Sequence, residues 1–158
     1  MRRIVLSVLL MVLVSVGVSA QQPFAELSVL LELEATLKAV NNDSELLESL
    51  VAGGRFVLFS GTIASRTLIN GDEADFLGEL ELIDGEWYGT EAVAMYKAYL
   101  RLEGPQFAGT IPARRSREKS PNEIETNTNF IVIGEVIESR QEESGVYPVI
   151  RVRYLRRI

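Results

Sequence analysis

The sequence contains no cysteine and no histidine. Without cysteine, a secreted domain held together by disulfides is excluded, and so is lipid attachment to a cysteine. Without histidine, the chain lacks the commonest general base, the commonest zinc ligand and every Ser-His-Asp or Cys-His arrangement. We therefore expect a domain that is stabilised by its packed core, that uses no metal or cofactor, and that is not an enzyme.

Basic residues are few, with 16 Lys and Arg against 22 Asp and Glu, which gives a net charge of −6. Negative surface repels the phosphates of nucleic acids and of anionic membranes. The charge balance therefore predicts no nucleic-acid partner, and leaves a protein or a component of the cell envelope as the expected partner.

The first twenty residues have the three parts of a secretory signal peptide. Arg2 and Arg3 precede an apolar run, residues 4–18, and small residues follow as far as Ala20. The run is short for a membrane span, and no basic stop-transfer segment comes after it. We expect cleavage between Ala20 and Gln21, export to the bacterial periplasm or beyond, and no membrane span afterwards.

Residues 21–54 predict a helical segment. Apolar residues recur there at three- and four-residue spacings, at Leu27, Leu30, Leu31, Leu37 and Val40. Asn41-Asn42-Asp43 interrupts the pattern, and Asp43 or Ser44 is the expected N-cap of a second helix, 45–52, that ends at Gly53-Gly54. Alternating apolar residues over 27–33 leave a strand as the alternative for the first part.

From Arg55 onward the pattern changes to strands. The segments expected are 55–69, 76–88 with a turn at Asp84-Gly85, 92–103, a short piece at 106–111, 130–138 and 146–155. Gly61 is expected to bend the first strand. In the last strand, alternation predicts that Ile150, Val152 and Tyr154 share one face, opposite Arg151 and Arg153.

Two acidic features have ordinary explanations. Glu79 and Glu81 share one face of a strand and could form a pair for glycoside hydrolysis, but the opposite face carries the core residues, which favours a solvated face. The residues 70–75 gather oxygen ligands, but their spacing departs from a calcium loop and favours a polar turn.

Three segments together resemble an OB-fold, a Greek-key barrel. These are the bent strand 56–63, the hairpin 79–87 and the strand 130–136. More narrowly, residues 55–155 are similar to small exported bacterial OB-like domains of unknown function. The resemblance implies a mainly β (α+β) fold of five to six strands, with a binding face on the central strands and no catalytic residue.

The expected organisation is therefore a signal peptide, 1–20, a helical N-terminal segment, 21–54, and an OB-like β-barrel domain, 55–158. Within it, two sets of residues are candidates for binding. One is the basic cluster of the long polar loop 112–129, which would contact an acidic partner or be merely solvated: Arg114, Arg115, Arg117 and Lys119.

The other set is aromatic. Trp87 and Tyr88, with Tyr96 and Tyr99, either fill the β core or stack on a ligand. Together these features predict an exported, non-enzymatic domain that binds a protein or an envelope component. The alternative is a small-ligand or sugar-binding barrel that uses Trp87 and the nearby tyrosines.

Overall fold

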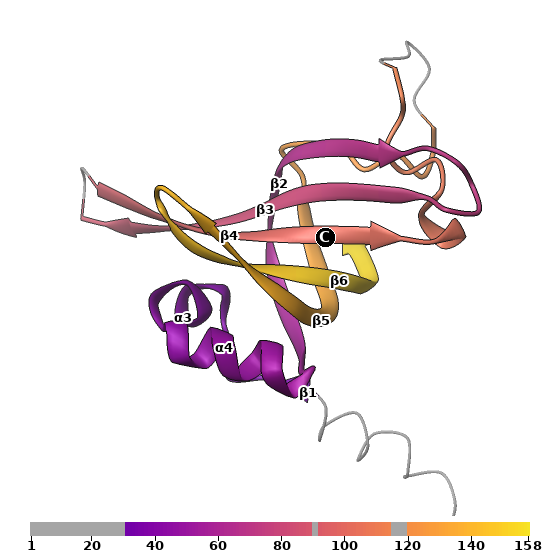
Figure 1. The fold of residues 1–158 in the computed structure, drawn as a ribbon. Helices are drawn as coiled ribbons and strands as arrows, with labels where there is room; N and C mark the ends of the chain where they lie inside the picture. Colours follow the sequence, from indigo (N-terminus) through magenta and orange to yellow (C-terminus); the bar gives the residue numbers. More distant parts are fainter. Residues whose placement is uncertain (1–30, 90–91, 115–119) are drawn as a thin grey trace, which may run out of the picture. The chain divides into compact units, whose positions relative to one another are not determined.

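The computed structural model describes residues 31–89, 92–114 and 120–158, and Leu31–Ile158 forms one compact unit. Its elements follow one another along the chain as shown in Figure 1: β1 (Leu31–Glu32), α3 (Leu37–Asn42), α4 (Ser44–Gly53), β2 (Phe56–Asn70), β3 (Leu77–Tyr88), β4 (Ala92–Glu103), the 3-10 helix η1 (Pro105–Phe107), β5 (Asn129–Glu142) and β6 (Gly145–Arg157). The predicted signal peptide lies outside the described residues.

The two helices begin and end at capping residues. The Thr36 side chain accepts a hydrogen bond from the Ala39 N–H at the start of α3, and the Asp43 side chain accepts one from Leu46 at the start of α4. Gly54, with a φ of 55°, closes α4 in the left-handed conformation that glycine adopts readily. The predicted second helix and its caps are confirmed.

The first part of the helical prediction is confirmed at α3, Leu37–Asn42, and is wrong for the described residues before it. Leu31–Glu32 forms a short strand parallel to the start of β2, with Leu31 opposite Phe56, and the first helix within the described residues begins at Leu37. Alternating apolar residues, which gave a strand as the alternative, are therefore the better guide here.

The strands form a closed ring. Their order is β2-β3-β4-β6-β5, and a further pairing between β5 and β2 completes the circle. The strands β2, β3 and β4 form a meander, and β5 returns beside β2, which is the Greek-key arrangement. Then β6 lies between β5 and β4, parallel to β4. The predicted mainly β, OB-like Greek-key fold is confirmed.

One long strand, β2, makes the closure possible. It pairs with β5 over Phe56–Thr62 and with β3 over Thr62–Asn70, so it changes partner next to Gly61. A Cβ atom at Gly61 would lie 2.5 Å from the Ile83 carbonyl oxygen. The predicted bend at Gly61 is therefore confirmed, and it needs the absence of a side chain because two backbones approach closely.

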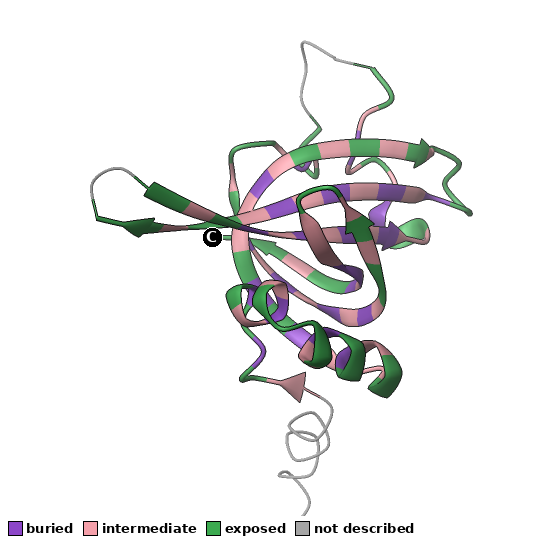
Figure 2. Ribbon diagram, turned by 60° about the vertical axis from the view of Figure 1, so that its left-hand side comes forward, coloured by how far each residue is buried: buried purple, intermediate pink, exposed green. Residues whose placement is uncertain are grey.

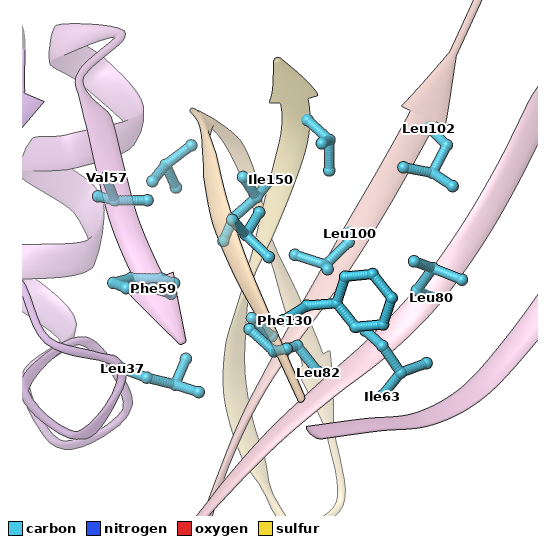
Figure 3. Packing of buried hydrophobic residues seen from close by; sticks show 14 of the residues in the cluster. Leu37, Val57, Phe59, Ile63, Leu80, Leu82, Leu100, Leu102, Phe130 and Ile150 are labelled. Carbon is cyan, nitrogen blue, oxygen red and sulfur yellow. The ribbon is translucent and has the colours of Figure 1, made fainter. Parts of the chain in front are cut away.

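Apolar side chains from every strand of the ring fill its interior. Figure 3 shows Ile63, Leu80, Leu100 and Leu102 among the residues of this cluster, and none of the four is measurably exposed. Both helices contribute to the same core, through residues that include Leu37 and Leu50. The helices thus cover the ring with their buried side chains, and they extend the core that a small barrel provides.

The predicted turn at Asp84-Gly85 is wrong. Both residues lie inside β3, which runs to Tyr88 and pairs without interruption with β4 as far as Ala92. The turn-forming dipeptide was overridden because residues 86–88 and 92–96 continue the ladder, and the pairing of whole strands outweighs a local preference.

A bulge explains a second difference. The β5–β6 register shifts between Ile133 and Gly134, because Ile133 pairs with Tyr154 while Gly134 pairs with Val152. The extra residue, Arg153, reverses the alternation. Ile150 and Val152 are buried as predicted, but Tyr154 is 47% exposed and points outward. The connection between the last two strands, expected over residues 139–145, is also shorter than predicted, since β5 ends at Glu142 and β6 begins at Gly145.

We expect Gly61→Ala to lower the free energy of unfolding by about 2 to 3 kcal/mol, because the new methyl group collides with the Ile83 backbone. Chemical denaturation measures this. Gly85→Ala is the matched control: its Cβ would meet Met95 Sδ at 3.4 Å, an ordinary contact, and we expect a change of less than about 1 kcal/mol. Equal losses in the two variants would show that the bend does not depend on Gly61.

Candidate functional site on the β3–β4 arm

The hairpin of β3 and β4 extends beyond the ring. The pairing of β2 with β3 ends at Thr62 and Ile83, whereas β3 and β4 remain paired as far as Tyr88 and Ala92. We call this extension, residues 84–88 and 92–96, the arm. Figure 1 shows the arm projecting to the left of the other strands.

The outward face of the arm is apolar. Trp87 lies opposite Val93, and Met95 lies opposite Gly85, so the three side chains share one face of the ribbon. Trp87 is 72% exposed, Met95 54% and Val93 41%. Figure 2 shows the arm largely in the colour of exposed residues. Single exposed apolar residues are common, but several large ones side by side on the surface indicate an interaction site.

The opposite face of the arm is polar and is held by α3. Lys38 Nζ lies 2.5 Å from Glu86 Oε2 and 5.7 Å from the centre of the Tyr88 ring. The Tyr88 hydroxyl donates to Glu86 at 2.7 Å, and it lies 3.1 Å from the Tyr96 hydroxyl. The hydrogen bond from Lys38 lowers the pKa of Glu86, which keeps this carboxylate charged.

Tyr96 is the most buried member of this hydrogen-bonded group on the polar face. Its ring is only 6% exposed, and its hydroxyl reaches Glu86 at 3.3 Å. The hydrogen bond with Tyr88 and partial desolvation raise the pKa of Tyr96 to about 12. Because these contacts occupy the polar face, the arm presents its apolar face to solvent.

A side chain also covers the edge of β4. The Asn41 amide nitrogen donates to the Lys97 carbonyl at 3.0 Å, and the Asn41 oxygen accepts from the Lys97 N–H at 2.8 Å. This pair of hydrogen bonds replaces the ladder that a neighbouring strand would form. The arm is thus anchored to α3 at its base as well as along its polar face.

Below the arm, the outer face of β4 carries a cluster around Tyr99. Arg140 stacks on the Tyr99 ring with 3.9 Å between its guanidinium carbon and the ring centre, and it donates to both Glu79 oxygens, at 2.8 and 2.6 Å. This bidentate, stacked geometry is specific to arginine. The hydrogen bond from Arg140 lowers the pKa of Glu79.

Lys97 extends the same cluster. It pairs with Glu142 at 2.6 Å and lies 4.3 Å from the centre of the Tyr147 ring, while the Tyr99 hydroxyl donates to Glu142. Burial opposes the charge on Lys97, but the hydrogen bonds of Glu142 and Tyr99 outweigh it and raise its pKa. These contacts hold the turn of the β5–β6 hairpin against β4, next to the base of the arm.

Glu79 and Glu81 face outward, as the strand alternation predicts. Glu79 is held by Arg140, and Glu81 accepts from the Ser65 hydroxyl at 3.1 Å and lies 3.8 Å from Lys97 Nζ. In the predicted polar turn, the Asn70 side chain accepts from the Asp72 N–H at 3.0 Å. No group of three or more acidic side chains suited to a metal ion occurs in the described residues.

The described start of the predicted basic loop lies far from Trp87. Ile111, at the start of the basic loop, packs beside Gly78, and Gly78 is nine residues from Trp87 along β3, about 30 Å at 3.3 Å per residue. Arg114 is exposed. The rest of the predicted basic cluster lies outside the described residues: Arg115, Arg117 and Lys119.

Trp87 and Tyr88 are adjacent on the arm but face opposite ways. Of the two alternatives left open for these aromatics, core packing applies to Tyr96, which is buried, and not to Trp87, which is exposed. Sequence reasoning missed Val93 and Met95. The signal was available, since both alternate with Ala94 and Tyr96 on the second strand and pair with Trp87 and Gly85 once the turn is placed beyond Tyr88.

No protein-family model matches the chain, and no curated protein matches it. Solved structures are similar in fold alone. One is the small single-stranded DNA-binding protein from Streptomyces coelicolor, with a TM-score of 0.40 and 11% identity, over 65% of this chain and 93% of that one. Another is a deletion mutant of the single-stranded DNA-binding protein from Thermus aquaticus, with a TM-score of 0.40 and 16% identity, over 65% of this chain and 48% of that one.

The prediction that excluded nucleic acid as a partner is contradicted by these neighbours, because both are single-stranded DNA-binding proteins, and we withdraw it. Its weakness was the use of a net charge, which averages over the whole surface. The strand β6 carries arginines at positions 151, 153, 156 and 157 in a chain that is acidic overall. No helix among the described residues is both long and apolar enough to cross a membrane.

We expect the fluorescence of Trp87, the only tryptophan, to be that of an indole in water, because its side chain is 72% exposed. Acrylamide should quench the folded and the urea-unfolded chain about equally, and unfolding should shift the emission little. Emission that is shielded in the folded chain and exposed on unfolding would contradict the placement of Trp87 on the arm.

We expect Glu79→Gln to lower the free energy of unfolding at pH 7 by about 1 to 2 kcal/mol, because it removes a charged, bidentate partner of Arg140. A lowered pKa stabilises the fold above the ordinary value of 4.5, and this stabilisation is lost as the pH falls through the folded-state value. The difference between the variant and the natural chain should therefore close in acid.

Glu103→Gln is the control for that experiment. Its pair with Arg151 is about one third exposed on each side, and we expect a loss below about 0.5 kcal/mol. A difference between Glu79→Gln and the natural chain that persists unchanged in acid would contradict the role given to the Glu79 carboxylate.

Proposed function

We propose that this chain is an exported, non-enzymatic binding domain, and that it binds a protein partner through the apolar face of the arm. The observation that carries the proposal is the position of the single tryptophan, 72% exposed on a projecting ribbon beside Met95 and Val93. Tryptophan is the residue type most enriched where binding energy concentrates in protein interfaces. Export is supported by the signal-like pattern of the first twenty residues.

The arm suits binding because it is rigid as well as apolar. Lys38, Glu86, Tyr88 and Tyr96 hold its polar face, and Asn41 holds its edge, so little conformational freedom is lost when a partner docks. A preorganised aromatic anchor converts more of its contact area into affinity than a flexible one does.

The surroundings of Trp87 favour a protein over a sugar. A sugar site combines a stacking ring with polar groups that bond the hydroxyls. The side chains that share the face with Trp87 are Val93 and Met95, which offer apolar contact instead. Methionine in particular adapts to irregular apolar partners.

The test places a photo-crosslinking amino acid at position 87 of residues 21–158 and, as a matched control, at position 69. Ile69 is 56% exposed on β2, outside the arm. We expect a defined protein adduct from cell-envelope preparations at position 87 but not at position 69. We expect Met95→Ser to lower the affinity for this partner at least about tenfold, because an apolar side chain that the partner would bury is lost. Identical adducts at both positions would show that the arm has no special role.

A further inference from the structure

One methionine lies on the apolar face of the arm. The sequence has three methionines, Met1, Met11 and Met95, and the first two belong to the predicted signal peptide. Met95 is therefore the sole methionine of residues 21–158, which also contain no cysteine. Cysteine and methionine carry the oxidisable sulfur of proteins. In residues 21–158, sulfur chemistry is thus confined to one atom, Met95 Sδ.

This sulfur is open to solvent. The Met95 side chain is 54% exposed, and the residue across the ladder is Gly85, which has no side chain to cover it. A Cβ atom at Gly85 would lie 3.4 Å from Met95 Sδ, so the sulfur lies against the glycine. Trp87 and Val93, which share the face, are themselves exposed. Because oxidation of sulfur follows its exposure, a small dissolved oxidant reaches Met95 Sδ in the folded chain.

Met95 takes no part in the core. Its neighbours along β4, Ala94 and Tyr96, lie on the opposite face of the ribbon, and Tyr96 belongs to the buried cluster. Among the described residues, neither the buried cluster nor the apolar residues that pack against it include Met95. Oxidation of a methionine inside a core disrupts packing, whereas oxidation at this position changes the binding face and leaves the fold intact.

A sulfoxide would make the apolar face of the arm polar. The thioether is a weak hydrogen-bond acceptor, whereas oxidation converts methionine into a polar side chain. On the same face, Val93 offers no donor, and Lys97, two residues along β4, pairs with Glu142 at 2.6 Å. The new oxygen therefore stays hydrated. A partner that buries this face would have to bury a polar oxygen with it, which costs free energy unless a new hydrogen bond forms.

We propose that Met95 is a redox switch of the arm: a peroxide converts its thioether to the sulfoxide, and the oxidised chain loses affinity for its partner. This inference rests on the proposed function, since it takes the apolar face of the arm as the binding surface and adds the regulation of that surface. An exported chain also meets the oxidising conditions outside the cytoplasm.

The reaction is a two-electron oxygen transfer. The Met95 sulfur attacks one oxygen of hydrogen peroxide, so that an S–O bond forms and the O–O bond breaks. The second oxygen takes up the proton of the first and leaves as water. Sulfur is oxidised and the peroxide is reduced. Reductases return the sulfoxide to the thioether with two electrons from thiols, and the oxygen then leaves as water. This reversibility separates a switch from permanent damage.

The first measurement follows the reaction of residues 21–158 with hydrogen peroxide by mass spectrometry. We expect an added oxygen on the peptide that contains Met95, at about the rate of free methionine, because the sulfur is exposed. The denaturation midpoint of the oxidised chain should be unchanged. Oxidation at least about tenfold slower than that of free methionine, or unfolding of the oxidised chain, overturns the inference.

The second measurement tests binding by competition. The chain with the photo-crosslinking amino acid at position 87 is mixed with the cell-envelope preparation, and unmodified chain competes for the adduct. Catalase removes the peroxide beforehand, so that the partner is not oxidised. We expect the oxidised competitor to need at least about a tenfold higher concentration to halve the adduct. Treatment with methionine sulfoxide reductases should restore its competition.

Three variants serve as controls. Met95→Leu keeps an apolar side chain of similar size and should compete equally before and after peroxide treatment. Met95→Gln places a polar group near the position of the sulfoxide oxygen and should compete as poorly as the oxidised natural chain. Met95→Leu combined with Ile69→Met moves the thioether to an exposed position on β2, where its oxidation should leave competition unchanged.

Equal competition by the oxidised and the reduced natural chain overturns the inference, and the proposed function stands because the adduct at position 87 still forms. A loss of competition on oxidation of the variant that combines Met95→Leu with Ile69→Met also overturns it, since the effect would then not depend on the arm. If no adduct forms at position 87, the proposed function and the inference both fail.

Discussion

The pairing of one strand with two neighbours is the constraint on which the rest of the structure depends. The first half of β2 lies against β5 and the second half against β3, and the change occurs where Gly61 crosses close to Ile83. Without this bend the sheet would stay open and its apolar interior would be only half covered. The chain has no cysteine and so no disulfide, and the closed ring and its core supply the stability that cross-links provide in many small secreted domains.

The arm is a consequence of strand length. β3 and β4 each have twelve residues, but the pairing of β3 with β2 ends at Ile83. The surplus residues form a two-stranded ribbon, which is marginally stable in isolation. Here α3 supports the ribbon through Lys38 and Asn41. Because α3 lies on one side only, the opposite face of the ribbon stays uncovered.

The sequence predicted the strands and the second helix because their signals are local. Alternation of Leu80 and Leu82 with Glu79 and Glu81, and the caps at Asp43 and Gly54, depend on neighbours within a few residues. The end of β3 and the exposure of Trp87 depend on where β2 stops pairing, which is set by residues far away in the sequence. The exposure of Tyr154 depends on a bulge that neither strand reveals alone.

The same logic applies to charge. The basic cluster of the loop stood out in the sequence because its members are close together along the chain. In contrast, only the strand register shows that Arg151 and Arg156 of β6 lie beside Glu135 and Ile131 of β5. Charges that are close in the sequence are therefore easy to recognise, whereas charges that neighbouring strands bring together are not. The net charge of the chain reveals neither arrangement.

The side chain of Asn41 also affects how the protein avoids pairing with other chains. By occupying the Lys97 N–H and carbonyl, it closes a strand edge that would otherwise be ready to pair with any extended segment. Asn41 belongs to α3, a six-residue helix near the amino-terminal end of the unit, where folded chains open most readily. Fraying of that helix would unmask a hydrogen-bonding template beside an apolar ribbon, so the short helix protects the molecule against misassembly as well as supporting its fold.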